Sequence, residues 1–205
     1  MRRFFLKSFL LVTTLASAIS AQAQFQFSDV DIVLGRLVFL AFRPDVKAEL
    51  KVTPEQYSKM TGAFGDSLEV DGERMSIRLT GSEDLEAMEK DALKVLDEAQ
   101  TKRLAELRTQ YVGALVLGLE KPAKEVGLSE DQRKEVAKIM KSTAESLQDL
   151  FSGGHSPEMI KDSEAIRKKS GERVLALLNE DQRKRFEGLK GKEFKFKTPD
   201  KPAIS

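Results

Sequence analysis

The chain has 205 residues, one third of them charged, and contains neither cysteine nor tryptophan. The absence of cysteine excludes disulfides, thiolate catalysis and cysteine-ligated zinc, so core packing must hold the folded protein together. The 34 Lys and Arg residues are interleaved with 33 Asp and Glu residues, which argues against a nucleic-acid-binding protein with its basic stripe.

The first 23 residues have the pattern of a secretory signal peptide. Three basic residues precede an apolar stretch over 9–19, and the small residues Ala21 and Ala23 form a cleavage site. The apolar stretch is too short for a membrane span. Without those three basic residues, 31 basic side chains face 33 acidic ones, a net charge of −2. We therefore expect an exported protein, periplasmic or extracellular, with no stable membrane span after cleavage near Gln24.

Apolar residues dominate 30–42, and they predict a helix that is either buried against the rest of the chain or open to a partner protein. Burial is the favoured interpretation. Pro44 suits the first turn of a second helix, which extends to Leu50. Thr53 and Pro54 then begin a third helix.

The pattern changes between residues 62 and 81. Apolar and polar residues alternate on both sides of Asp71-Gly72, and the apolar ones are Leu68, Val70, Met75, Ile77 and Leu79. Alternation around an Asp-Gly turn predicts a short β-hairpin near 67–79, with a ragged helix as the alternative.

Helical spacing returns at Ser82 and is followed by a long helix from Asp97, which we expect to reach Leu119 although Gly113 and Gly118 weaken its end. Ser129 begins the next helix, which ends in the turn at 152–157.

Two more helices are predicted in the last quarter of the chain, over 157–178 and from Asn179 to about Lys190. Gly191 stops the second of them. Phe194 and Phe196 belong to a tail that we expect to lie on the surface and to anchor in a groove.

Four helix starts share one motif, in which a short polar residue precedes a glutamine by three positions. In such a capping box the polar side chain accepts from the backbone of the first turn, and the glutamine reaches back to the capping residue. The four motifs are Thr53 with Gln56, Asp97 with Gln100, Ser129 with Gln132, and Asn179 with Gln182.

The motifs fall into two pairs, which predicts two related helical units. Residues 46–60 pair with 94–108 in the first unit, and 122–136 pair with 176–190 in the second. The sequence thus predicts an all-α bundle or cradle built from two pseudo-repeats. Its expected parts are a signal peptide (1–23), an apolar N-terminal helix (24–45), a first repeat (46–120), a second repeat (121–191) and a tail (192–205).

The residue patterns of catalysis and metal binding are absent from the sequence. His155 is the single histidine, and it lies in a Gly-Gly turn without an obvious second ligand. No nucleophile, zinc-protease or nucleotide-binding motif is present. Acidic pairs at helix starts are explained by the helix dipole. We therefore expect that the protein is not an enzyme and that it has no metal site and no cofactor.

The paired motifs, of the form apolar–Ser/Thr–x–x–Gln, resemble the LTxxQ motif of the Spy/CpxP family of periplasmic proteins. Thr53 to Gln56 and Ser129 to Gln132 carry the resemblance, and the motifs at Asp97 and Asn179 are looser copies. The resemblance implies an all-α, cradle-shaped homodimer that binds unfolded proteins without ATP or damps an envelope-stress sensor. Residues 62–81 depart from the family's continuous helices.

Two functions from different classes follow. The first is an ATP-independent envelope chaperone, which holds unfolded proteins on an apolar patch. The second is a structural or regulatory module that binds one envelope protein in a helix groove. For either function the candidate apolar partner face consists of Leu37, Leu40, Phe42, Phe194 and Phe196.

Overall fold

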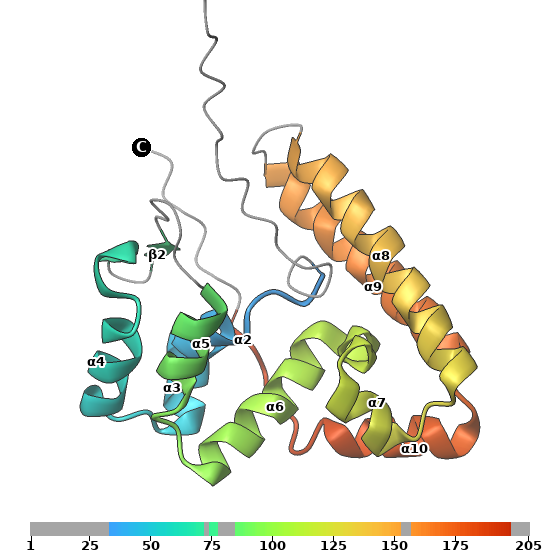
Figure 1. Cartoon of the computed structure of the whole chain (residues 1–205), viewed down its shortest axis with the longest axis horizontal. Coiled ribbons are helices and arrows are strands. Elements are labelled where there is room, and N and C mark those ends of the chain that lie inside the picture. Colours follow the sequence, from blue (N-terminus) through green and yellow to red (C-terminus); the bar gives the residue numbers. More distant parts are fainter. Residues whose placement is uncertain (1–32, 72–73, 78–84, 153–156, 198–205) are drawn as a thin grey trace, which may run out of the picture.

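The computed structural model describes residues 33–71, 74–77, 85–152 and 157–197. These residues form an all-α fold with one short hairpin (Figure 1). In chain order the elements are α2 (Leu37–Phe42), α3 (Pro44–Leu50), α4 (Pro54–Gly62), the 3₁₀ turn η1 (Gly65–Ser67), β1 (Leu68–Asp71), β2 (Arg74–Ile77), α5 (Leu85–Leu93), α6 (Glu98–Val112), the 3₁₀ helix η2 (Gly113–Gly118), α7 (Glu120–Val126), α8 (Glu130–Ser152), α9 (Pro157–Ala176) and α10 (Glu180–Leu189).

Two hydrophobic cores divide the described chain into two halves. The first core is made by α2 to α6, and its fully buried side chains include Met60 and Leu107. The second core is made by η2 and α7 to α10, with Leu115 and Leu147 fully buried. Because η2 packs in the second core, the first core ends and the second begins near Gly113.

The longest helix, α8, shows how sequence spacing forms these cores. Its buried residues recur every three or four positions and make one stripe along the helix: Val136, Ile139, Met140, Thr143, Ala144 and Leu147. The stripe packs against α9, and α8 and α9 form an antiparallel pair on one side of the molecule (Figure 1). The hydroxyls of Thr143 and Ser170 lie 2.7 Å apart between the two helices.

Both strands of the predicted hairpin are present. β1 and β2 are antiparallel, with Leu68 opposite Ile77 and Asp71 opposite Arg74. The Asp-Gly turn is only half described, since Gly72 lies outside the described residues, as does Leu79.

Two predicted helices are wrong in their extent, and glycines with positive φ are the cause. Gly35 has a φ of 67°, and the helix predicted over 30–42 is therefore interrupted at Gly35-Arg36 in its described part. Gly113, with φ 62° and ψ −146°, ends α6 at Val112, so the helix does not reach Leu119. A positive φ of this size favours glycine, which has no Cβ to clash with the backbone. In the described part of the chain no helix combines the length and apolar character needed to cross a bilayer.

Candidate functional site

All four predicted capping boxes form, and their glutamines also meet in pairs. At the starts of α4 and α6, Gln56 Nε2 donates to Gln100 Oε1 at 2.8 Å, and Gln100 Nε2 donates back to Gln56 Oε1 at 3.1 Å. Each amide also donates to a backbone carbonyl of the facing connection, from Gln56 to Val95 and from Gln100 to Leu50.

The second half contains the same arrangement. Gln132 and Gln182 exchange two hydrogen bonds of 2.8 Å at the starts of α8 and α10. Their remaining N–H groups donate to the carbonyls of Leu177 and Gly127. The geometry is thus shared by both halves, whereas a duplication of the chain stays a prediction.

The paired glutamines have no hydrogen-bonding capacity left for a ligand. Each Nε2 makes two bonds, and each Oε1 accepts from its partner and from the backbone N–H of its own capping residue, as Gln132 does from Ser129. A hollow of about 420 Å³ beside the first pair is lined by Glu49, Lys51 and Arg103 among others. Because both amides there are saturated, the motif joins two helix starts and contributes no binding group.

Two residues of the candidate apolar partner face are buried, as the favoured interpretation of 30–42 expected, so they do not form an open face. Leu40 and Phe42 are buried in the first core, because α2 packs its apolar face against α3, α5 and α6. Leu37, Phe194 and Phe196 are partly buried against the same core. Phe39 is 42% exposed and Tyr111 is 55% exposed, and neither belongs to the partner face predicted from the sequence. No sequence signal distinguished Phe39 from its neighbours, because all six residues of α2 are apolar.

A groove of about 710 Å³ lies between the two halves, and it contains both of these exposed aromatics. One wall comes from the segment around Gly35, from α2 and from the end of α6, and the other comes from α9. Apolar side chains from both halves line it: Leu34, Leu37, Phe39, Leu40, Tyr111, Val112, Ala114 and Leu175.

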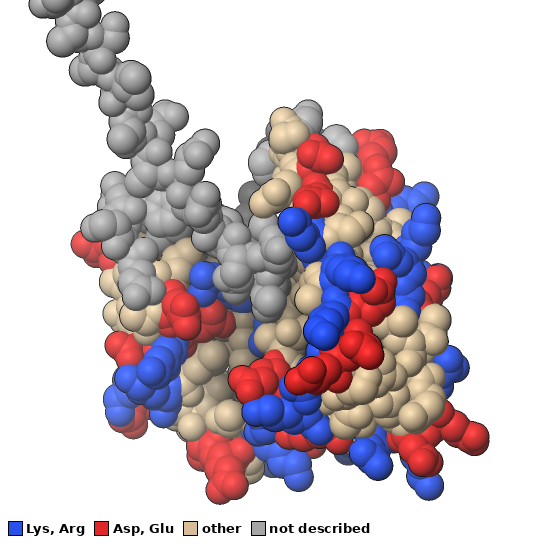
Figure 2. All heavy atoms as spheres, turned by 45° about the vertical axis from the view of Figure 1, so that its right-hand side comes forward, with Lys and Arg blue, Asp and Glu red and all other residues tan. Residues whose placement is uncertain are grey.

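Basic residues exceed acidic ones among the described lining of this groove. They are Arg36, Arg43, Arg108, Arg167 and Lys168, against Glu164 and Glu172. Arg36 pairs with Glu89 at 3.0 Å, and Arg167 donates to the carbonyl of Val33 at 2.9 Å. Burial lowers the pKa of Arg167, but a guanidinium keeps its charge at neutral pH. Elsewhere the charges are mixed, and Figure 2 shows Lys and Arg interleaved with Asp and Glu on the visible face.

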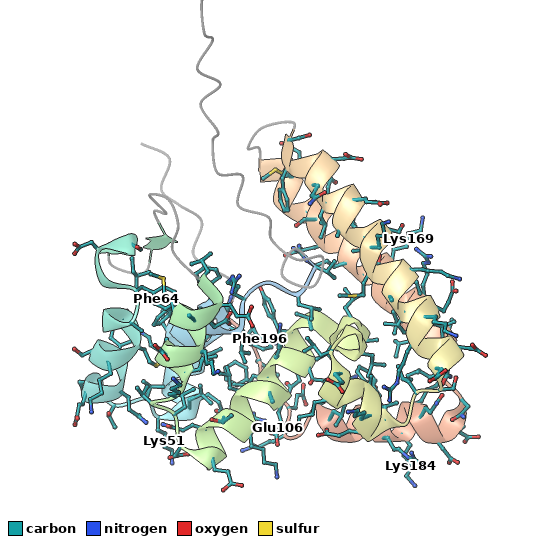
Figure 3. The ribbon with its side chains drawn as sticks, viewed as in Figure 1. Lys51, Phe64, Glu106, Lys169, Lys184 and Phe196 are labelled. Carbon is teal, nitrogen blue, oxygen red and sulfur yellow. The ribbon has the colours of Figure 1, made fainter. Side chains whose placement is uncertain are left out.

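The C-terminal tail crosses from the second half to the first and lies at the edge of this groove. Phe194 and Phe196 form an edge-to-face pair with ring centroids 4.9 Å apart. The ring centroid of Phe196, which is labelled in Figure 3, also lies 5.2 Å from that of Tyr111. The Arg43 guanidinium lies 5.5 Å from the Phe196 centroid. The tail thus anchors through both phenylalanines on the first core.

Asp45 ties the tail to α3. Its carboxylate pairs with Arg43 at 2.9 Å and accepts from the backbone N–H of Lys197 at 2.8 Å. Burial raises the pKa of Asp45, but the hydrogen bonds from Arg43, Lys197 and Val46 outweigh it and hold the pKa below its ordinary value. Asp45 is therefore an anion at neutral pH.

The described residues contain no group of three or more His, Asp or Glu side chains that could hold a metal ion. His155 lies outside the described residues. No protein-family model, curated protein or solved structure compared with this chain matches it. The resemblance to the Spy/CpxP family therefore rests on the capping-motif residues alone.

Proposed function

We propose that this protein is a non-enzymatic, ATP-independent holdase that binds segments of unfolded polypeptides in the groove between its halves. The observation that carries the proposal is the groove itself, which exposes Phe39 and Tyr111 between two separately packed cores. Two exposed aromatics in one concave site are typical of a binding surface rather than of ordinary solvated surface.

The lining of the groove suits a polypeptide. Tyrosine and arginine are enriched among residues that dominate protein–protein binding, and Tyr111, Arg43 and Arg108 supply both here. The apolar side chains would accept the hydrophobic residues that an unfolded protein exposes. The proposal includes no catalytic step.

The first experiment measures how the purified chain without its first 23 residues suppresses aggregation. Light scattering of two unrelated unfolding proteins is followed without ATP at stoichiometric ratios. We expect both to be kept in solution. Suppression of only one would favour the alternative function, a module for one dedicated partner, and suppression of neither by the folded protein would refute the holdase.

A pair of matched variants tests whether the groove is responsible. Phe39→Ser and Tyr111→Ser should each weaken suppression several-fold, because they remove the exposed rings of the groove. Phe151→Ser is the control, since Phe151 is 41% exposed, almost the same as Phe39, but lies at the far end of α8, outside the groove lining. Equal losses from Phe39→Ser and Phe151→Ser would show that general surface hydrophobicity acts instead.

Export and dimerisation belong to the same proposal. The signal-peptide pattern of residues 1–23 supports an envelope location, and expression of the full chain in a bacterial host should give a secreted product whose N-terminal sequence begins near Gln24. The resemblance to the Spy/CpxP family supports a homodimer, which multi-angle light scattering of the mature chain would detect as twice the monomer mass. An uncleaved cytosolic product would contradict the proposed location.

A further inference from the structure

Side chains of the first half hold the backbone of the tail by hydrogen bonds, in addition to the contacts of its two phenylalanines. Gln110 Nε2 donates to the carbonyl of Lys192 at 2.8 Å, and Gln110 Oε1 accepts from the N–H of Phe194 at 2.9 Å. Farther along, Asp45 accepts from the N–H of Lys197, and the Arg43 guanidinium donates to the Lys197 carbonyl at 2.8 Å. These bonds depend on an extended backbone and not on which side chains the segment carries.

The side chains of the tail alternate between the protein and solvent. Phe194 and Phe196 are partly buried against the first core, whereas Lys195 and Lys197 are exposed. This period of two is that of an extended chain. Main-chain hydrogen bonds combined with contacts for alternate side chains are the means by which proteins bind extended peptides. The surface formed by Arg43, Asp45, Gln110 and Tyr111, here called the tail site, has both features.

The tail site is continuous with the groove. Arg43, Gln110 and Tyr111 belong to the lining of the groove as well as to the tail site. A polypeptide that leaves the groove along α6 therefore meets the surface that the tail covers. The polar groups of the tail site would be exposed to solvent if the tail detached, and they could bind the backbone of another chain in the same way.

We propose that the tail is an intramolecular ligand of a peptide-binding site, and that this site takes an extended segment of another polypeptide with aromatic residues at alternate positions. The inference deepens the proposed function and rests on it for the origin of the external segment. A tethered tail competes at an effective concentration in the millimolar range. When the tail occupies the site, the apparent affinity for an external segment equals the intrinsic affinity multiplied by the fraction of molecules in which the site is free.

The test uses a fluorescein-labelled peptide with the sequence of residues 191–199, GKEFKFKTP, and the full mature chain. Fluorescence anisotropy measures peptide binding to wild type and to Phe194→Ala/Phe196→Ala, whose own tail competes poorly. We expect the double variant to bind the peptide at least tenfold more tightly than wild type does. Lys195→Ala is the control, because Lys195 is exposed, and it should bind as wild type does.

Two further measurements assign the binding to the tail site. Adding Gln110→Ala to the double variant should abolish binding, since it removes the bonds to Lys192 and Phe194. A peptide with alanine at both phenylalanine positions should not bind. Circular dichroism and thermal unfolding establish that each variant is folded, and Phe196→Ala alone replaces the double variant if the latter does not fold.

The results separate this inference from the proposed function. Equal or absent peptide binding by wild type and the folded tail variants would overturn the tail site, whatever the aggregation assay shows. Tight binding by the double variant that Gln110→Ala abolishes would support the tail site even if Phe39→Ser leaves aggregation suppression unchanged. In that event the groove, and not the tail site, would be the part of the proposal that fails.

Discussion

At the scale of single residues, the glutamines of the capping boxes serve two helices at once. A capping box uses only the side-chain oxygen of its glutamine, which leaves two N–H donors to be satisfied. In each half, those donors bond to the other glutamine of the pair and to a backbone carbonyl of the facing connection. Gln182, for example, donates to Gln132 and to the carbonyl of Gly127. A local motif thereby fixes the distance between two helix starts that are far apart in sequence.

Gln182→Ala should lower the free energy of unfolding by about 2–3 kcal/mol, because it leaves one N–H of the Gln132 amide and the carbonyl of Gly127 without their partners in a partly buried site. Gln148→Ala, on the exposed face of α8, should change it by less than about 0.5 kcal/mol. Urea unfolding measures both. Aggregation suppression per folded molecule should be unchanged by Gln182→Ala, since the pair lies outside the groove lining.

The same pair provides a test of coupling. Gln132→Ala/Gln182→Ala should cost less than the two single changes together, by at least about 0.5 kcal/mol, because each single change removes the two hydrogen bonds that the glutamines exchange. Strict additivity would show that the two glutamines act only as separate helix caps.

Lys51 and Gly127 occupy equivalent positions, each ending a seven-residue helix in the left-handed region, with φ of 54° and 79°. Lys51 is marked in Figure 3. The Cβ of lysine is sterically strained in this region, whereas glycine has no Cβ. Lys51→Gly should therefore raise the free energy of unfolding by up to about 1 kcal/mol, and Gly127→Ala should lower it by about 1–2 kcal/mol.

Ala48→Gly is the control for Lys51→Gly, because Ala48 is an exposed residue inside the same helix, where glycine costs about 1 kcal/mol. Opposite signs for these two glycine substitutions would support the backbone argument. A loss of stability from both would contradict it.

At the scale of elements, the sequence predicts where helices begin better than it predicts where they end or which elements they pack against. Thr53 and Asn179 begin helices through bonds within four residues, so their motifs suffice. The end of α6 was missed because only the backbone at Gly113 reveals a conformation that stops the helix. The groove could not be predicted, since it joins residues from α2, α6 and α9, and the burial of Leu40 depends on how α2 packs against three other helices. The pairing of the glutamines depends on distant contacts in the same way.

The tail was predicted to anchor through its phenylalanines, but its polar attachment was not, because Asp45 and Gln110 are more than 80 residues away from the groups they bind. The attachment gives the tail a pH dependence. The pKa of Asp45 is lower in the folded protein than its unfolded value of about 3.9. Its contribution is therefore present above the unfolded pKa and is lost as the pH falls through the folded one.

We expect the tail to stay attached from pH 8 to pH 5 and to detach only below about pH 4. The amide resonances of Phe194 and Lys197 in ¹⁵N-edited NMR spectra measure this directly. In Asp45→Asn the tail should be loosened at every pH, and the acid transition of these two resonances should disappear. Detachment centred near pH 6 would assign the transition to a group other than Asp45.

At the scale of the whole molecule, the two halves are connected by more than the chain between α6 and η2. Val33 and Leu34 belong to the second core although α2, which follows them, belongs to the first. The tail runs the other way, from α10 in the second half to Phe194 and Phe196 on the first core. With crossings at both ends of the described chain, the halves are held against each other. We expect the width of the groove to depend on the direction in which the chain leaves α6.

Gly113 sets that direction. Its φ of 62° and ψ of −146° are accessible almost only to glycine. No atom beyond the two neighbouring residues lies within 4 Å of where a Cβ would be, so the expected effect of a methyl group there is backbone strain. Gly113→Ala should lower the free energy of unfolding by about 1–3 kcal/mol. Because the residue lies in the groove lining between the two halves, relaxation of the strain should also move the walls and weaken aggregation suppression in the folded variant.

Gly188→Ala distinguishes this effect from the mere addition of a methyl group. Gly188 lies in α10 with equally open space around it, and alanine there should be neutral or stabilising by up to about 1 kcal/mol, with suppression unchanged. Thermal unfolding and light scattering of both variants provide the comparison. If Gly113→Ala kept full stability and full suppression, the geometry of the groove would have to be fixed by the two crossings and not by the chain at Gly113.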